Sequence, residues 1–386
     1  MAEQQPAARG FKYTTGIRDE DIAEVRAMIG QPLRIPQWNL EASIDTIRHY
    51  AFGLGDDNPL WCDEDYASRT QYGSIVAPPT FPYSVFPAGI GPGFPGLQVF
   101  QAGGRWELKR YIRPGERIVP SATLVDVKEV QGRRAGRMLL LIGETVYRTK
   151  AGEALARNLS RQFRVARKGA DASSGLQYES RAHTWTDDEL DRMEDEILAY
   201  QRRGAVPRYW EDTAVGEALQ PRIKGPLDLQ TLMTYYAGNL AGGFYRSTDM
   251  QVRHRRLALT RPDLVPTCRP PEVQAERIAY GQGHLDAAVA AEVGMPGVYD
   301  NGWMRVGWVQ QVLTDWMGDD AFLEMFDTTT HLPNIIGDIV RFTGRVIARR
   351  EEGGRSLVDL EIRGERQDGE LSIKGTATIR LPRKAR

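Results

Sequence analysis

Hydrophobic and polar positions along the chain follow two periods, one helical and one typical of strands. Apolar residues recur at helical spacing in four stretches, which are residues 17–29, Leu40–Leu54, Asp228–Gly238 and Trp303–Met317. Runs rich in Val, Ile, Leu and Tyr, separated by turns such as RPGE and QDGE, predict strands over Arg105–Ile112, Glu116–Val130, Met138–Arg148, Ala154–Val165, Asp338–Arg349, Ser356–Arg366 and Leu371–Leu381. Groups of strands preceded by helices predict an α+β fold with mostly antiparallel sheets.

One apolar stretch fits neither period. Residues 74–87, SIVAPPTFPYSVFP, are hydrophobic but carry four prolines within ten positions, 78–87. Proline is tolerated in the first turn of a helix and disfavoured in its interior, so a helix could begin only after these prolines.

The chain divides near its middle. RKGADASSG (Arg167–Gly175) has the composition of a flexible linker. A helix follows, with Thr186 and Glu189 in capping-box spacing and Gly204 as its predicted stop. We therefore expect a first domain over 1–168, a linker with a helix over 169–205 and a second domain over 206–386.

The two domains are related by an internal repeat. Trp61 and His284 are each followed by Asp at +2 and Ala at +6, and the entry to an apolar segment lies at +18 in both halves (79 − 61 and 302 − 284). A Gly-containing turn follows 54 residues after the first anchor (115 − 61) and 53 after the second (337 − 284). The halves are therefore interpreted as two copies of one unit, a helix lying on an antiparallel sheet.

Composition narrows the class of protein. The 386 residues include 50 Lys and Arg and 51 Asp and Glu, for a net charge of −1, which does not favour binding to nucleic acid or a membrane surface. The first residues lack an apolar signal core, and no run is long enough to cross a bilayer. Cys62 and Cys268 lie far apart without metal-site spacing. We expect a cytoplasmic protein without a metal.

At this point the motifs resemble a known family. YAFGLGDDNPLWCDEDYA followed by APPTFP, and GHLDAAVAAEVGMPGVYDNG, closely resemble the two halves of MaoC-like, double hot-dog acyl-CoA dehydratases, including the FAS1-like N-terminal dehydratase domain. The resemblance covers nearly the whole chain from about residue 38. It implies two tandem hot-dog domains, each with an antiparallel sheet wrapped around a long helix. It also implies an acyl-CoA substrate, no cofactor beyond the coenzyme A of that substrate, and a homodimer.

The resemblance carries over to particular residues, and the halves differ. The family site is an Asp and a His in Y-x-G-D-x-N-P-x-H-x-D. The first half keeps Asp56, but Trp61 stands at the His position, and indole cannot take a proton from water. The second half keeps His284 and Asp286, while Asn239 stands at the Asp position. The first half is therefore expected to make room for the acyl group, with Trp61 contacting it.

The resemblance predicts roles in the second half. His284 would be the general base and acid, Asn239 or a nearby carboxylate would orient the water, and Gly302 N–H would polarise the thioester. Asp286, two residues after His284, could take part in the chemistry or could equally stabilise the start of the following helix. The carboxylate partner stays open among Asp286, Asp300, Asp249, Asp56 and Asp57. Asn301 and Trp303 are expected to contact substrate.

An insert of some forty residues (240–283) precedes His284. It is rich in arginine, which allows two interpretations. It could be a lid whose guanidinium groups bind the phosphates of coenzyme A, or a solvated loop in which acidic residues balance the arginines. The residues predicted to bind phosphate are Arg253, Arg255 and Arg256. The expected activity is that of an (R)-specific enoyl-CoA hydratase or 3-hydroxyacyl-CoA dehydratase. A non-catalytic or partner-dependent subunit and an acyl-CoA thioesterase are the alternatives.

Overall fold

A computed structural model describes residues 16–132, 136–166, 183–239, 246–276, 282–292 and 294–384. Its helices are α1 (Asp19–Arg26), α2 (Ile44–Gly53), α3 (Pro59–Cys62), α4 (Glu64–Ser68), α5 (Asp187–Ala199), α6 (Leu229–Asn239), α7 (Thr248–Thr260), α8 (Pro271–Gln274), α9 (Ala287–Glu292) and α10 (Gly302–Met317). Short 3₁₀ turns are η1 (Phe81–Ser84), η2 (Trp210–Asp212), η3 (Pro262–Leu264) and η4 (Gln282–His284). The predicted linker at Arg167–Gly175 lies outside the described residues.

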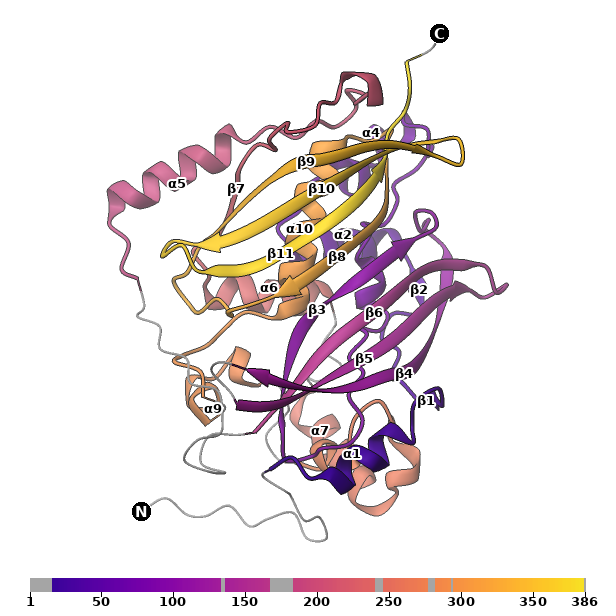
Figure 1. The fold of residues 1–386 in the computed structure, drawn as a ribbon, viewed down its shortest axis with the longest axis vertical. Helices are drawn as coiled ribbons and strands as arrows, with labels where there is room; N and C mark the ends of the chain where they lie inside the picture. Colours follow the sequence, from indigo (N-terminus) through magenta and orange to yellow (C-terminus); the bar gives the residue numbers. More distant parts are fainter. Residues whose placement is uncertain are drawn as a thin grey trace.

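Both halves contribute strands to one continuous sheet (Figure 1). The strands are β1 (Pro32–Leu33), β2 (Glu41–Ala42), β3 (Gln98–Leu108), β4 (Glu116–Gly132), β5 (Gly136–Thr149), β6 (Ala154–Val165), β7 (Arg222–Lys224), β8 (Phe322–Thr330), β9 (Val340–Glu352), β10 (Arg355–Arg366) and β11 (Leu371–Arg380). Their order is β1-β4-β5-β6-β3-β8-β11-β10-β9-β7, with β2 paired to β4, and every paired strand is antiparallel. The halves meet where β3 pairs with β8, with Trp106 opposite Phe326.

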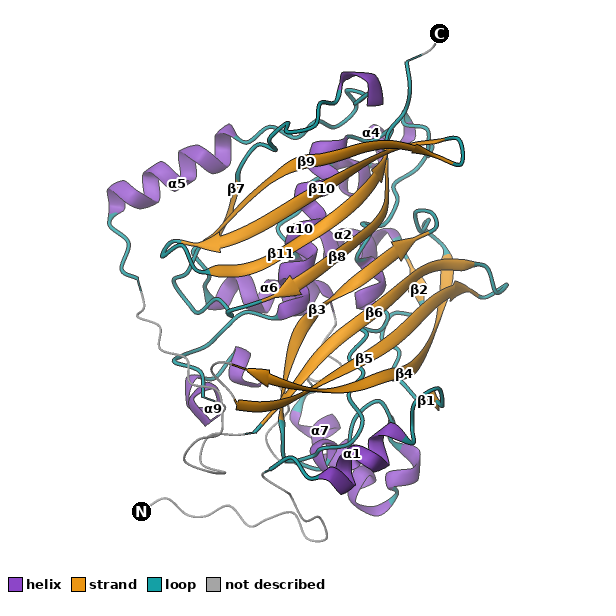
Figure 2. Ribbon diagram, viewed as in Figure 1, coloured by secondary structure: helices purple, strands orange, loops and turns teal. Residues whose placement is uncertain are grey.

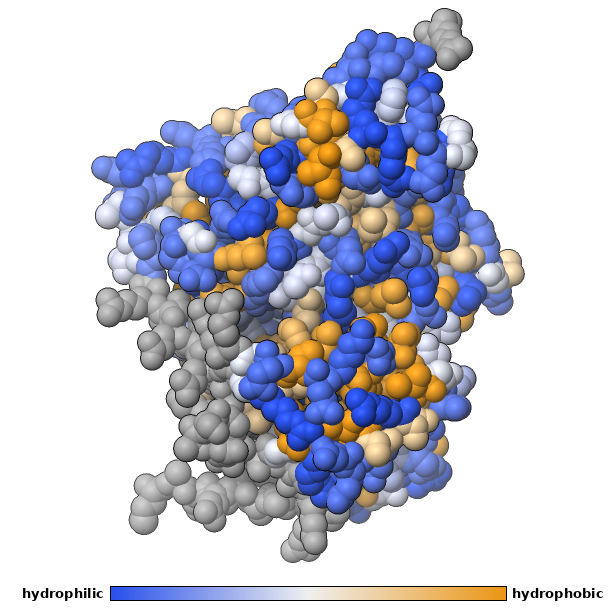
Figure 3. Space-filling model, in the orientation of Figure 1, coloured by the Kyte–Doolittle hydropathy of each residue, from blue (hydrophilic) through white to orange (hydrophobic). Residues whose placement is uncertain are grey.

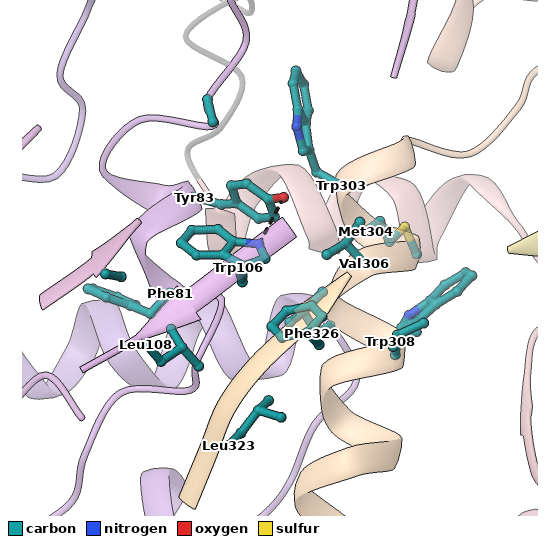
Figure 4. Close-up of a cluster of buried hydrophobic side chains, with 14 of the residues drawn as sticks. Phe81, Tyr83, Trp106, Leu108, Trp303, Met304, Val306, Trp308, Leu323 and Phe326 are labelled. Carbon is teal, nitrogen blue, oxygen red and sulfur yellow. Dashed lines mark hydrogen bonds between the residues drawn. The ribbon is translucent and has the colours of Figure 1, made fainter. Parts of the chain in front are cut away.

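The core lies between the concave side of this sheet and α10 (Figure 2). Every residue of α10 is buried, which explains why its apolar positions are not confined to one stripe. Its side chains pack with those of the first half at the junction of the halves, where Trp106 Nε1 donates a hydrogen bond to Tyr83 Oη at 3.1 Å (Figure 4). The outward face is different, with hydrophobic atoms in separate patches among hydrophilic ones (Figure 3). The α+β double hot-dog prediction is confirmed.

The two halves are not equivalent copies, because the first lacks the long helix. Where α10 stands in the second half, the first has the single turn η1 within an otherwise irregular segment, 74–97, that is almost entirely buried. The expectation of a helix in each half is therefore corrected. Six prolines, at 78, 79, 82, 87, 92 and 95, account for it, since each removes an N–H donor and disrupts a helix interior.

Other elements agree with the sequence or differ in detail. The capping box of Thr186 and Glu189 begins α5, which ends at Ala199 with Tyr200 as its C-cap, rather than at the predicted stop Gly204. The helix predicted over Asp228–Gly238 is α6, which packs against α2. Strand β8 was not predicted, although it joins the two halves.

Candidate active site

A cavity of about 510 Å³ lies between the two halves. The first half contributes residues of β3 and β6 and the glycines Gly89 and Gly91, while the insert contributes Arg269, Pro270 and Val273. The second half contributes His284, residues 299–303 and Arg305, and the loops around His331 and Glu370. Such a volume is in the range typical of small-molecule sites.

His284 is held in one orientation on the cavity wall. Its Nδ1 lies 2.9 Å from the carbonyl oxygen of Tyr299, and the ring packs beside the Tyr299 ring with centroids 4.3 Å apart. A carbonyl only accepts, so Nδ1 donates and Nε2 is the proton acceptor of the neutral ring. Burial lowers the pKa of His284 to about 4, with nearby Arg305 acting in the same direction and the Tyr299 carbonyl opposing. At neutral pH the imidazole is uncharged and can accept a proton.

The N-terminus of α10 opens on the same cavity. Asn301 is the N-cap, and its Oδ1 accepts a hydrogen bond from Trp303 N at 2.9 Å. Gly302 lies beside it on the cavity wall, where the first helical N–H groups and the helix dipole favour negative charge. A Cβ at position 302 would lie 2.6 Å from Gln101 Oε1 and 2.8 Å from Gln101 Cβ, so β3 approaches this closely only because residue 302 is glycine.

A buried ion pair fixes the segment between His284 and α10. Asp300 Oδ2 lies 3.0 Å from Arg305 Nε, and the residues are 1% and 4% exposed. Asp300 also accepts hydrogen bonds from Asn334 N at 3.1 Å and Asn334 Nδ2 at 2.5 Å. Burial raises the pKa of Asp300, and Arg305 opposes that shift. Arg305 Nη1 donates to the carbonyls of Leu332 and Ser372, so this pair connects α10 to two loops of the cavity.

Five carboxylates were considered as partners of His284. Among the described residues, Asp300 is the one of these five that lines the cavity. Asp286 instead caps α9, because its Oδ1 accepts from Ala288 N at 2.8 Å and Val289 N at 3.2 Å. That geometry is the bracing role. The catalytic role of Asp286 stays a prediction.

Several predicted site residues lie elsewhere. Asn239 is buried at the end of α6, donates from Nδ2 to Tyr235 Oη at 2.7 Å, and does not line the cavity. Trp61 is fully buried in α3 and does not line the cavity either, whereas Trp303 does. From the insert, Arg269 reaches the cavity, while Arg253, Arg255 and Arg256 sit on α7 away from it.

Three lining or adjoining residues were missed in the sequence. Tyr236 Oη lies 3.3 Å from Asn301 Nδ2, and its ring lies near His284 with centroids 6.3 Å apart. Tyr236 begins the sequence YAGN (236–239), which ends at the candidate residue Asn239. Gln101 and Arg164 line the cavity from β3 and β6. Nothing in the local pattern distinguishes these two, because the strand pairing alone brings them to the second half.

The first-half motif forms a buried network of charges. Asp56 Oδ1 accepts from Asn58 N, and burial raises the pKa of Asp56, as does the nearby Asp315 of α10. Lys224 Nζ donates to the carbonyls of Leu54 and Gly55, and burial lowers its pKa. Arg202 Nε donates to Asp315 Oδ1 at 2.8 Å. Gln311 Nε2 of α10 donates to the carbonyl of Gly55 at 3.1 Å, so the first-half motif contacts α10 directly.

Comparison with known proteins identifies the family. Residues 27–158 match the family described as "FAS1-like, dehydratase domain region". A UPF0336 protein of Thermobifida fusca is 30% identical over 135 residues, which are 33% of this chain and 85% of the relative, and one of Parafrankia is 30% identical over 117 residues, 28% and 74%. The chain belongs to the MaoC-like hot-dog dehydratase family.

Solved structures agree on the fold of this MaoC-like chain. A protein described as a MaoC-like dehydratase superposes with a TM-score of 0.64 at 16% identity, covering 93% of this chain and all of the other. A putative MaoC domain protein dehydratase of Chloroflexus aurantiacus gives 0.55 at 10% identity, covering 99% and 100%. A Mycobacterium tuberculosis protein described as having a double hotdog fold gives 0.51 at 10% identity, covering 92% and 96%.

Neither a metal site nor a membrane-spanning helix is found among the described residues. No cluster of three or more His, Cys, Asp or Glu side chains is arranged to hold a metal ion there. In that same part of the chain, no helix combines the length and hydropathy needed to span a membrane.

Proposed function

We propose that this protein is an (R)-specific enoyl-CoA hydratase or 3-hydroxyacyl-CoA dehydratase, working without a cofactor. One observation carries the proposal: an uncharged histidine with a fixed tautomer and the N-terminus of a buried helix share one cavity. Addition of water to an enoyl thioester needs a base for the water and a donor for the thioester oxygen, which gains negative charge.

The reaction would use these groups in turn. In the hydration direction, His284 Nε2 takes a proton from water while the oxygen bonds to C3 and the electron pair of the double bond moves toward the thioester. Gly302 N–H stabilises the resulting oxyanion. The imidazolium then returns the proton to C2, so the enzyme is regenerated and one water is consumed. Dehydration is the reverse.

The test compares wild type with His284→Gln on a panel of trans-2-enoyl-CoA thioesters, with loss of enoyl absorbance as the readout. The variant should lose at least about 100-fold in kcat/KM, within the range of general acid–base catalysis. His49→Gln, an exposed histidine on α2, is the matched control and should retain activity. Full activity of His284→Gln would refute the assignment, and release of free CoA from saturated thioesters would indicate a thioesterase instead.

A second candidate is a binding subunit that needs a partner for chemistry. It is favoured by the position of Asn239 away from the cavity and by the engagement of Asp300 with Arg305 and Asn334. Saturable binding of acyl-CoA by an isolated chain that hydrates none of the panel would support this candidate. The predicted homodimer is checked separately by light scattering.

A further inference from the structure

Gln101 of β3 carries a buried amide that has no hydrogen-bond partner among the described residues. Both of its polar atoms, Oε1 and Nε2, are in this position, although an amide can accept two hydrogen bonds and donate two. Burying a polar group without a partner costs free energy, so few native side chains do so. The amide therefore indicates a partner that the chain itself does not supply.

An irregularity in β3 brings this side chain to the inner face of the sheet. In the pairing of β3 with β6, Gly104 lies opposite Ser160 and Gln101 lies opposite Gln162, with a register shift directly after Gln101. β3 thus has one residue more than β6 over this stretch, which is the geometry of a β-bulge. Without the extra residue, Ala102 would lie opposite Gln162 and Gln101 would point to the outer face. The bulge therefore turns Gln101 toward the cavity, which this residue lines.

The amide lies against the start of α10. A Cβ at Gly302 would lie 2.6 Å from Gln101 Oε1 and 3.2 Å from Gln101 Cδ. Gly302 is the first residue of α10, so its N–H belongs to the donors that have no partner within the helix. Neither atom of the Gln101 amide is held by a described residue, so rotation about its flexible stem can present Nε2 to the cavity. Two N–H donors, one from each half, thus lie side by side.

Two neighbouring donors suit the oxygen of a thioester. This oxygen has two lone pairs, and in the proposed addition of water it gains negative charge as the electron pair of the double bond moves toward it. Gly302 N–H supplies one hydrogen bond in that mechanism. An amide N–H can supply the second without losing its proton, so the role of base stays with His284.

We propose that Gln101 is a catalytic residue whose Nε2 donates a second hydrogen bond to the thioester oxygen, beside Gly302 N–H. This proposal rests on the proposed function for the identity of the reaction. It gives the first half a direct part in the chemistry, since the base His284 and the helix α10 both come from the second half.

Gln101→Met tests the proposal, because methionine keeps the unbranched stem and removes the amide. With trans-2-hexenoyl-CoA, kcat should fall by about 100-fold, as for the loss of one donor to an oxyanion, while KM changes by less than about tenfold. Stability should not fall with it. The urea midpoint should equal or exceed that of wild type, because an apolar group replaces an unpaired buried amide. Gln230→Met, at an exposed position of α6, is the control and should change neither quantity.

Two results would overturn the proposal. One is a kcat of Gln101→Met within about threefold of wild type, since the loss of an oxyanion donor is far larger. The other is a urea midpoint well below that of wild type in both Gln101→Met and Gln101→Leu, or failure of both variants to fold. Either form of that second result would mean that the amide supports the fold rather than the substrate.

Binding separates this proposal from the proposed function. Hexanoyl-CoA and the thioether S-hexyl-CoA differ only in the thioester oxygen, and calorimetry with them needs no turnover. The preference of wild type for the thioester should exceed that of Gln101→Met by about 2- to 10-fold, the range of one neutral hydrogen bond. Such a difference in a chain that hydrates nothing would refute the hydratase and support the contact of Gln101 with the oxygen. Hydration at equal rates by wild type and Gln101→Met would do the opposite.

Discussion

Replacing Arg305 by methionine tests how the cavity wall is held. The substitution keeps an unbranched apolar side chain and removes the guanidinium that pairs with Asp300 and bonds to the carbonyls of Leu332 and Ser372. Because Asp300 is 1% exposed, its charge would stay buried with Asn334 as its polar partner. Removing one member of a buried pair costs about 3–5 kcal/mol.

The sign of the pH dependence follows from Asp300. Burial raises its pKa in the folded protein, and Arg305 lowers it. Without Arg305 the folded-state pKa rises further, so the folded protein binds a proton more readily than the unfolded chain does. Protonation removes the uncompensated charge, and the penalty of Arg305→Met should be larger at pH 8 than at pH 5.

Urea unfolding followed by tryptophan fluorescence measures this, since Trp303 and Trp308 lie on α10. Arg345→Met is a matched control at an exposed pair with Glu361, where the loss should be about 0–1 kcal/mol. The double variant Asp300→Asn, Arg305→Met removes both charges and should lose less than Arg305→Met alone. A loss in Arg305→Met no larger than in Arg345→Met, or a double variant worse than the sum of the singles, would refute the reasoning.

Two further predictions concern His284 and the start of α10. Because burial lowers the pKa of His284 to about 4, kcat/KM for hydration should stay flat from pH 8 to 6 and fall only in the acid range near pH 4; a limb centred near 6.5 in a pH–rate profile would contradict this. Asn301→Ala removes the cap on Trp303 N and the contact with Tyr236, so urea unfolding should show a loss of about 1 kcal/mol, and kcat should fall with it. Asn301→Asp keeps the capping oxygen and should retain most of the stability, and equal losses in both variants would count against the cap.

The repeat could be predicted from the sequence because the residues at its shared spacings form local structure, namely helix caps and buried helix positions. Asp63 Oδ1 accepts from Tyr66 N to cap α4, just as Asp286 caps α9 at the equivalent position. Ala67 and Ala290, at +6, are both fully buried. Capping and close packing depend on residues a few positions apart, so they leave a signal in the linear pattern.

What the sequence did not predict depends on pairing between distant segments. Strand β8 contains FLEMFDTTT, whose pattern does not distinguish it until β3 and β11 pair with it. Arg164 and Gln101 likewise come to the cavity through strand order alone. The prolines of residues 74–97 are evident in the sequence. Whether a helix follows them depends on tertiary packing against the sheet, which the local sequence does not specify.

The two ends of α10 make different contacts. Its N-terminus, with Gly302, faces the cavity, whereas Asp315 near its C-terminus is bound by Arg202. Gln311 Nε2 donates to the carbonyl of Gly55, within the motif of the first half. The Gly55–Asp56 loop of the first half, which has no histidine at the site position and no long helix, therefore contacts α10 directly. The loop anchors the far end of the helix whose near end meets the substrate in our proposal, so mutations around Gly55 should act on catalysis through the position of α10.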